Sequence, residues 1–258
     1  MQKESENAKQ IVSEADFDEA LSRLTLDYIA EFAAGAGHEL GNPLAIISAI
    51  AQKYLKSEQD ANKRDAFAKI IEQTNRCYEV VAEIRNFARP PKPDLKRVDL
   101  VQLFNDWTFR EKERSRDRNV YVETENFQES EIEIETDPAL LSCILDALGK
   151  NALEASRDDE GKLIFFGATR TLLDDPSKLV VELGVENNGA ELSDEEATLV
   201  FAPFYSGRQA GRGLGFGLPK AQRYADVLGI ELKRENPRLL DAGNRWVLIF
   251  SISNVSAS

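Results

Sequence analysis

The chain has 258 residues, which is long enough for two modest domains that each bury an apolar core. Hydrophobic residues make up 42% of it and charged residues 30%, a composition typical of folded globular proteins rather than of disordered ones. The formal net charge of −13 argues against nucleic acid or an anionic membrane surface as a partner, because both select clustered Lys and Arg.

Residues 1–16 are polar, and we interpret them as an N-terminal tail rather than a signal peptide. No apolar run approaches the ~20 residues that a membrane-spanning helix needs. We therefore expect a cytoplasmic chain with no membrane segment.

Residues 17–89 are predicted to form a helical hairpin, because apolar side chains recur at spacings of three and four on both sides of a polar break. The first stripe consists of Phe17, Leu21, Leu24, Tyr28, Leu40, Leu44, Ile47, Ala51 and Tyr54, and the second of Ile70, Cys77, Val80, Ile84 and Phe87. A single hairpin cannot bury both stripes, so the pattern predicts a homodimer that completes a four-helix bundle.

Three prolines interrupt the pattern after this hairpin, and we interpret residues 90–97 as a linker. The mixed pattern of residues 98–254 predicts a second, α/β domain with helices on one face of a mixed sheet. Its expected helices cover residues 100–116, 138–155 and 214–228, and its expected strands cover residues 119–125, 131–136, 162–170, 178–186, 230–235 and 245–253. The helix at 138 is the best marked, since Asp137 is an N-cap residue followed by proline at the first helical position.

The two cysteines, Cys77 and Cys143, lie within helical apolar patterns and lack a second Cys or His at metal-ligand spacing. We expect both to be small buried residues in a reducing compartment.

His38 is the chain's only histidine. It lies about 200° around the helix from Leu40, so it is expected to point away from the bundle, with Asn42 on its own face and Glu39 beside it. An exposed imidazole next to a carboxylate is suited to nucleophilic attack. The alternative is a surface histidine without a role.

Two features of the second domain suggest a ligand. The buried stripe of helix 138–155 continues into Asn151, whose amide either makes a structural hydrogen bond or faces a cavity that holds a charged ligand. Residues 211–217 form a glycine-rich turn that opens a helix, an arrangement that can bind phosphates or can simply be a flexible loop.

The motif HELGNPL at residues 38–44 resembles the H-box of sensor histidine kinases. Residues 151–155 (NALEA), 201–205 (FAPFY) and 211–218 (GRGLGFGL) are similar to the N-box, F-box and G-box of the same family, in the family's order. The resemblance covers about residues 25–252 and implies a two-layer α/β sandwich of the histidine kinase/Hsp90-like type. It places ATP under a lid between about residues 188 and 212.

The resemblance also implies the roles of the site residues. His38 would accept phosphate from ATP, Glu39 would act as general base, and Asn42 would position the phosphate or a hydrolytic water. Asn151 would coordinate Mg²⁺. The other nucleotide contacts would be Lys150, Asn187, Gly189, Phe204, Gly211, Gly213, Leu214 and Gly215. The phosphoryl group would then pass to an aspartate in the receiver domain of a response regulator.

Three positions depart from the family pattern. Asn187 replaces the carboxylate that receives the adenine amino group, Glu191 replaces a glycine of the lid, and Ala147 replaces the first asparagine of the N-box. Exchanging a charged acceptor for a neutral one should weaken ATP binding by about 1 kcal/mol. An ATP-impaired histidine phosphotransfer or docking module is therefore the main alternative, and a purely structural helical dimer is a third hypothesis.

Overall fold

The computed structural model describes residues 14–118, 120–157, 160–171, 178–205 and 215–253. The chain divides into two compact units, the first ending at Arg89 and the second beginning at Pro90, and each is described by itself. Within the described ranges, none of the helices is both long enough and apolar enough to cross a membrane.

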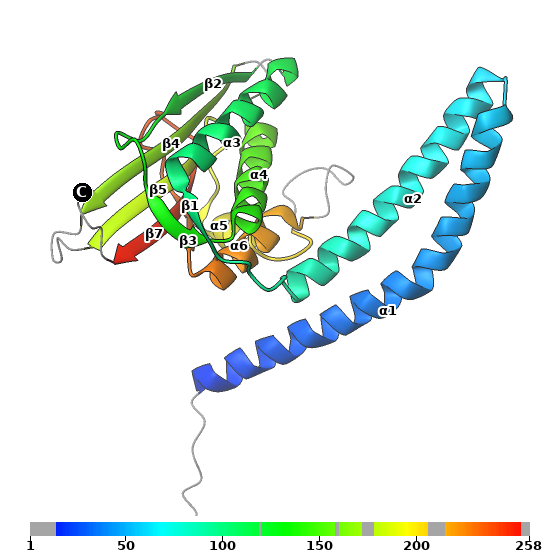
Figure 1. Ribbon diagram of the computed structural model, residues 1–258, viewed down its shortest axis with the longest axis horizontal. Coiled ribbons are helices and arrows are strands. Elements are labelled where there is room, and N and C mark those ends of the chain that lie inside the picture. Colours follow the sequence, from blue (N-terminus) through cyan, green and yellow to red (C-terminus); the bar gives the residue numbers. More distant parts are fainter. Residues whose placement is uncertain (1–13, 119, 158–159, 172–177, 206–214, 254–258) are drawn as a thin grey trace, which may run out of the picture. The chain divides into compact units, whose positions relative to one another are not determined.

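The first unit is an antiparallel hairpin of two long helices, α1 (Glu14–Ser57) and α2 (Ala61–Ala88) (Figure 1). The polar break between them is a capped turn. The Asp60 carboxylate accepts hydrogen bonds from two N–H groups in the first turn of α2, and Arg64 donates to the carbonyls of Leu55 and Glu58. These bonds satisfy backbone groups that a helix end leaves free, so the turn position is set locally.

Small residues make up much of the buried contact between the two helices. The buried side chains of the hairpin include Ala30, Ala33, Ser48, Ala51 and Thr74. Its exposed large apolar side chains are Leu21, Leu24, Tyr28, Phe32, Leu40, Ile46, Ile47, Ile50, Tyr54, Ile70 and Tyr78. One hairpin therefore leaves many of its large apolar side chains exposed, which is the situation that a bundle of two hairpins relieves.

The second unit is built on a five-stranded sheet with the order β2-β4-β5-β7-β6. The strands are β2 (Val120–Glu125), β4 (Gly161–Thr171), β5 (Lys178–Asn187), β7 (Asn244–Ser253) and β6 (Glu231–Glu235). β2 runs parallel to β4 and the other neighbours are antiparallel, so the sheet is mixed, as predicted.

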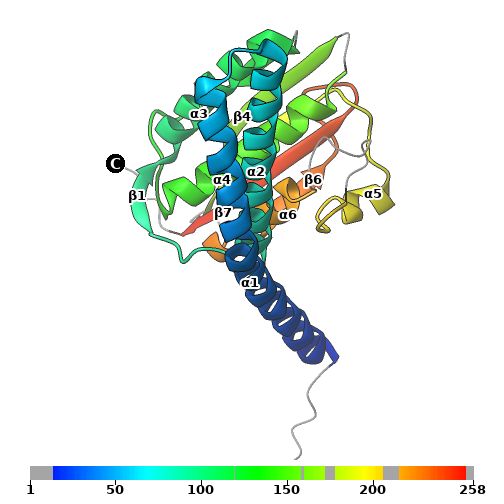
Figure 2. The ribbon, with the colours of Figure 1, turned by 90° about the vertical axis from the view of Figure 1, so that its right-hand side faces the viewer.

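Helices cover one face of this sheet (Figures 1 and 2). The helices of the second unit are α3 (Leu100–Ser115), α4 (Pro138–Ala155), the short α5 (Asp194–Leu199) and α6 (Gly217–Leu228), with a 3₁₀ turn at Arg116–Arg118. The core lies between helices and sheet, where the Trp107 and Phe165 rings meet edge-on with centroids 4.8 Å apart. The predicted fold class is confirmed.

Two features differ from expectation. Lys96 and Arg97, within the segment interpreted as a linker, begin β1 (Lys96–Asp99), which pairs with β3 (Glu133–Thr136) in a separate two-stranded sheet. The prediction of buried cysteines is wrong, because Cys77 and Cys143 are both exposed. Cys143 lies one residue before the fully buried Ile144, which turns its side chain about 100° away from the core.

Candidate functional site

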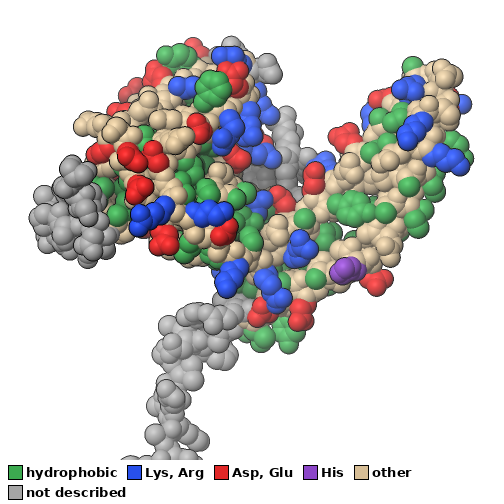
Figure 3. All heavy atoms as spheres, viewed as in Figure 1, with side chains coloured by type: hydrophobic (Ala, Val, Ile, Leu, Met, Phe, Trp, Pro, Cys, Tyr) green, Lys and Arg blue, Asp and Glu red, His purple; other side chains and the backbone are tan. Residues whose placement is uncertain are grey.

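His38, Glu39 and Asn42 are all exposed on α1, and the purple side chain in Figure 3 is the chain's only histidine. His38 and Asn42 are one helical turn apart, so they share a face. Pro43 has no N–H and cannot donate to the carbonyl of Glu39, which interrupts the helical hydrogen bonds beside the histidine. The structure thus presents the three predicted residues together to solvent.

Tyr78 of α2 forms a hydrogen bond with the segment of α1 that carries His38. Its hydroxyl donates a hydrogen bond of 2.5 Å to the carbonyl of Gly41, three residues after His38. Tyr78 lies off the apolar stripe of α2, so the sequence pattern did not indicate it. Only the register of the two helices shows that it lies opposite the histidine motif.

Hydrogen bonds to Asp137 fix the N-terminus of α4. Because the helix is rigid, they also help to position its C-terminal end, which carries Asn151. The N–H of Asp94 donates to the Asp137 carboxylate at 2.8 Å, and two N–H groups of the first helical turn donate to its other oxygen. The bond from Asp94 lowers the pKa of Asp137 most, and the helix N–H bonds and Lys96 lower it further, although burial acts in the opposite sense.

The last turns of α4 carry Asn151 at the edge of the core. Leu148 and Ala152 are fully buried, Asn151 is half-buried, and Lys150 is exposed. The stripe predicted from the sequence is therefore present. Asn151 continues this stripe at the edge of the core, where its side chain can contact both the protein and a ligand.

Asn187 ends β5 as a fully buried side chain. Neither atom of its amide, Nδ2 or Oδ1, has a hydrogen-bond partner among the described residues. Gly189 follows where the chain touches the end of α4: a Cβ at this position would lie 2.0 Å from the carbonyl oxygen of Ala155. Only glycine allows this approach, which brings the predicted residues Asn187 and Gly189 to the end of α4 that carries Asn151.

Asn188, between them, was not assigned a role from the sequence. Its Oδ1 accepts the N–H of Lys162 at 2.8 Å, and its Nδ2 donates to the carbonyl of Glu160 at 2.7 Å. These bonds tie the loop after β5 to the start of β4. A polar residue after a strand was the only available signal, and it does not distinguish an anchoring amide from a ligand-binding one.

The structure also brings Phe204 and Gly215 together. Phe204 has a positive φ of 65° and an exposed side chain, and its ring meets that of Phe216 edge-on at 4.8 Å. Gly215 has φ 71°, and a Cβ there would lie 2.5 Å from the Tyr205 carbonyl oxygen. Positive φ in a bulky residue is typical of functional segments. Gly211, Gly213 and Leu214, the remaining predicted contacts, lie outside the described residues.

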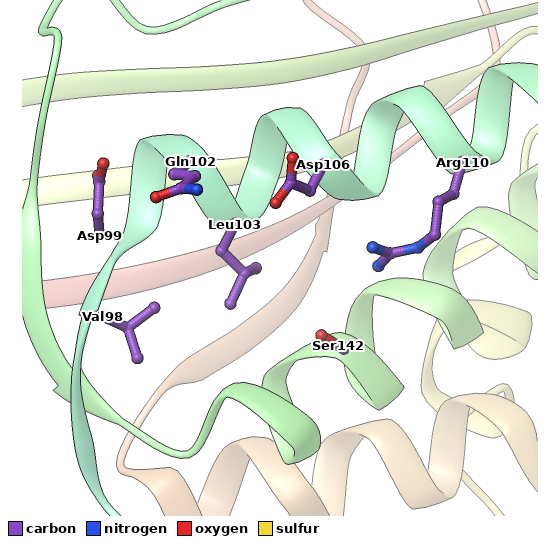
Figure 4. Close-up of a pocket in the computed structure, with 7 residues that line it drawn as sticks. All are labelled: Val98, Asp99, Gln102, Leu103, Asp106, Arg110 and Ser142. Carbon is purple, nitrogen blue, oxygen red and sulfur yellow. The ribbon is translucent and has the colours of Figure 1, made fainter.

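A cavity of about 230 Å³ lies elsewhere in the second unit (Figure 4). It is lined by Val98, Asp99, Gln102, Leu103, Asp106, Arg110 and Ser142, from β1, α3 and α4. None of these is a predicted site residue. Ser142 precedes Asn151 by nine residues, which is about 13 Å along the helix axis, so the cavity is separate from the Asn151 site.

Comparisons with known proteins agree with this geometry. Residues 28–92 match the HisKA family, the His Kinase A (phospho-acceptor) domain, and this range contains His38. The chain is 28% identical over 224 residues to sporulation kinase C of Bacillus subtilis, covering 86% of this chain and 49% of that kinase. It is 25% identical over 203 residues to the sensor histidine kinase ZraS of Escherichia coli K12, covering 78% and 42%. The chain thus spans about half the length of these curated relatives.

Solved structures show the same fold. Full-length ShkA, solved in complex with AMPPNP, superposes with a TM-score of 0.70 at 17% identity, over 88% of this chain and 47% of that one. The histidine kinase ThkA, solved in complex with the response regulator protein TrrA, superposes with a TM-score of 0.60 at 21% identity, over 91% and 65%. Residues 28–92 thus match the phospho-acceptor domain family, and most of the chain is similar to sensor histidine kinases.

Proposed function

We propose that this chain transfers the γ-phosphoryl group of ATP to His38 and then to an aspartate in the receiver domain of a response regulator. The observation that carries the proposal is the position of His38. It is exposed on α1, inside the range that matches the phospho-acceptor family, with the carboxylate of Glu39 beside it.

In the first step, a ring nitrogen of His38 attacks the γ-phosphorus while the bond to the β–γ bridging oxygen breaks and ADP leaves. Glu39 takes the proton that the imidazole loses, and Asn42, one turn away, positions the phosphoryl oxygens. In a phosphatase reaction on the phosphorylated response regulator, Asn42 would instead position the hydrolytic water. In the second step the receiver aspartate attacks the same phosphorus and the histidine leaves. Such transfers depend mainly on positioning and charge neutralisation.

The nucleotide is proposed to bind at the end of α4. Among the described residues, no group of three or more His, Cys, Asp or Glu side chains could hold a metal ion. Mg²⁺ needs no such cage, because it is commonly held by one or two protein oxygens together with substrate phosphates. Asn151 would supply one oxygen, and the metal would neutralise phosphate charge. The unsatisfied amide of Asn187 suits a ligand that offers a donor and an acceptor.

The remaining proposed contacts are Lys150, Gly189, Phe204, Gly211, Gly213, Leu214 and Gly215. Lys150 is exposed beside Asn151 and can reach a phosphate. Gly189 lies at the start of the predicted lid. Phe204 and Gly215 lie together near its other end.

The proposed partners are a second copy of the chain and a receiver domain. The exposed apolar side chains of α1, such as Phe32 and Ile47, supply the surface for a homodimer. The structure of ThkA with the response regulator TrrA supports a receiver partner. Because ATP and response regulators are cytoplasmic, the reaction belongs in the cytoplasm.

The test is incubation of the purified chain with Mg²⁺ and γ-labelled ATP, alongside a His38→Gln variant. Acid-labile label on the wild type and none on the variant is expected. Since His38 is exposed, the variant should keep the same circular dichroism spectrum and oligomeric state. A folded wild type that takes up no label would contradict the kinase proposal.

A phosphotransfer module that does not use ATP is the second candidate, and Asn187 in place of a carboxylate favours it. In that case His38 would remain unlabelled by ATP but would accept label from a phosphorylated receiver domain. Running both reactions on the same preparation separates the two functions.

A further inference from the structure

Two asparagines lie side by side at one end of the sheet. Asn187 of β5 and Asn244 of β7 are paired in register. Two residues earlier on β5, Val185 pairs with Trp246, and both belong to the core beneath the helices. Because side chains alternate along a strand, Asn187 and Asn244 face the same helix layer.

The two amides differ in what they bind. Oδ1 of Asn244 accepts the N–H of Leu192 at 3.2 Å, and its Nδ2 donates to the carbonyl of Ala190 at 2.7 Å. Asn244 therefore anchors the loop that follows β5. Asn187 is fully buried, and neither its donor nor its acceptor has a partner among the described residues. A buried amide is costly when unpaired, and a ligand that offers both a donor and an acceptor would satisfy it.

Two glycines lie against Asn187. Nδ2 of its side-chain amide lies 2.7 Å from the position that a Cβ of Gly189 would take, and its backbone carbonyl oxygen lies 1.9 Å from the Cβ position of Gly243. Glycine at position 189 therefore leaves space beside the amide that any other side chain would fill. The amide can still exchange its Nδ2 and Oδ1 by rotation about its last side-chain bond.

This rotation decides which base the amide accepts. Adenine presents an amino donor at position 6 next to the N1 acceptor, and a 6-oxopurine presents the O6 acceptor next to an N1–H donor. An amide has both a donor and an acceptor, so it can pair with either edge in one of its two orientations. A carboxylate only accepts, so it suits the adenine amino group and repels O6.

We infer that Asn187 makes the nucleotide site tolerant of the purine 6-position, so that 6-oxopurine triphosphates bind about as well as ATP. The inference rests on the proposed function, since it assumes that a nucleotide binds beside Asn151. It goes beyond that function by assigning base selectivity to one side chain. The same asparagine that weakens the site for ATP also widens the set of nucleotides it accepts.

The experiment is calorimetric titration of the full chain with ATP and with ITP in the presence of Mg²⁺. ITP serves as the probe because it differs from ATP only at position 6 and the N1 proton, and it lacks the 2-amino group of GTP. In the wild type, the two dissociation constants should agree within about threefold. In an Asn187→Asp variant, ATP should bind more tightly and ITP more weakly, which raises the ratio by about tenfold or more.

An Asn187→Leu variant of similar volume is the control, and it should weaken both nucleotides by a similar factor. Thermal unfolding of each variant checks that it is folded. A wild type that binds ATP but discriminates more than about tenfold against ITP would overturn the inference and leave the proposed function intact. An unchanged ratio in Asn187→Asp would equally overturn it. If the folded wild type binds neither nucleotide, the inference and the ATP-dependent function both fail.

Discussion

Glu186 and Arg245 form a buried ion pair between β5 and β7, with 2.6 Å between Oε1 and Nη1. Glu186 also accepts the N–H groups of Arg238, Leu239 and Leu240, so it holds the connection between β6 and β7. Glu186 precedes Asn187 and Arg245 follows Asn244, so the pair lies on the sheet face opposite the helices. The ion pair therefore fixes β5 and β7 to each other directly beside Asn187, the candidate base-binding residue.

Replacing Glu186 with alanine should lower the free energy of unfolding by about 3–5 kcal/mol, because Arg245 would lose its closest partner while remaining buried. Urea unfolding of the purified variant measures this. Glu231→Ala is the control: Glu231 is exposed and pairs only at the surface with Lys233, so its loss should cost about 0–1 kcal/mol. Equal costs for both variants would contradict the structural role of the buried pair.

Stability should fall in acid through Glu182, on the same sheet face. Burial alone would raise the pKa of Glu182, but the hydrogen bond from Arg170 and the charges of Arg238 and Arg245 outweigh burial and lower it. A carboxylate with a lowered folded-state pKa stabilises the protein above its unfolded value of 4.5, and this contribution is lost as the pH falls through the folded-state pKa.

The measurement is urea unfolding of the wild type and of Glu182→Gln at several pH values. The wild type should be the more stable near pH 7. The difference should begin to shrink below about pH 4.5 and should vanish once the pH has fallen through the lower folded-state pKa, because Glu182 is then uncharged in both the native and the unfolded state. A difference that does not change with pH would show that the carboxylate's charge contributes nothing.

Asp137 should stabilise the second unit as the cap of α4. Asp137→Ala removes the side-chain acceptor for the first helical turn and for Asp94, so about 0.5–2 kcal/mol of stability should be lost. Asp137→Asn keeps an accepting oxygen and should lose less. Thermal unfolding compares them, and a larger loss in the asparagine variant would argue against capping as the cause.

Ile47 should contribute to the proposed homodimer rather than to the fold of one hairpin, because the residue is 46% exposed in the single chain. Ile47→Asp should shift the proposed dimer towards monomer when light scattering is measured over a range of concentrations. Ala49→Asp places the same charge on an exposed position about 200° around α1 and is the matched control. If both variants dissociate equally, charge on the helix, not the apolar stripe, is responsible.

Glu39→Gln should lower the rate of His38 labelling by ATP by about 10²–10⁴-fold, since it removes the proposed general base. Glu39 is exposed on α1, so nucleotide affinity and unfolding temperature should not change. The initial rate of acid-labile labelling is the readout. A variant with the wild-type rate would show that the proton leaves the imidazole by another route.

Local patterns were enough to predict much of the fold. Asp137 and Pro138 mark the start of α4, and the observed helix has the bounds predicted from the sequence. The strands β4 and β5 follow from runs of apolar and β-branched residues. These predictions succeed because capping and periodicity depend on neighbours a few residues away. β1 was missed, since its four residues are mostly charged and become a strand only by pairing with β3.

The sequence by itself determined the chemistry available to this protein: one histidine beside a glutamate on a helix, an asparagine at the end of a buried stripe, and glycines where the chain turns. The tertiary structure decided how these groups are used. Asn187, Asn188 and Asn244 have identical side chains, yet two anchor loops and one remains unpaired. That difference arises from strand register and loop closure between distant segments, which no local pattern records.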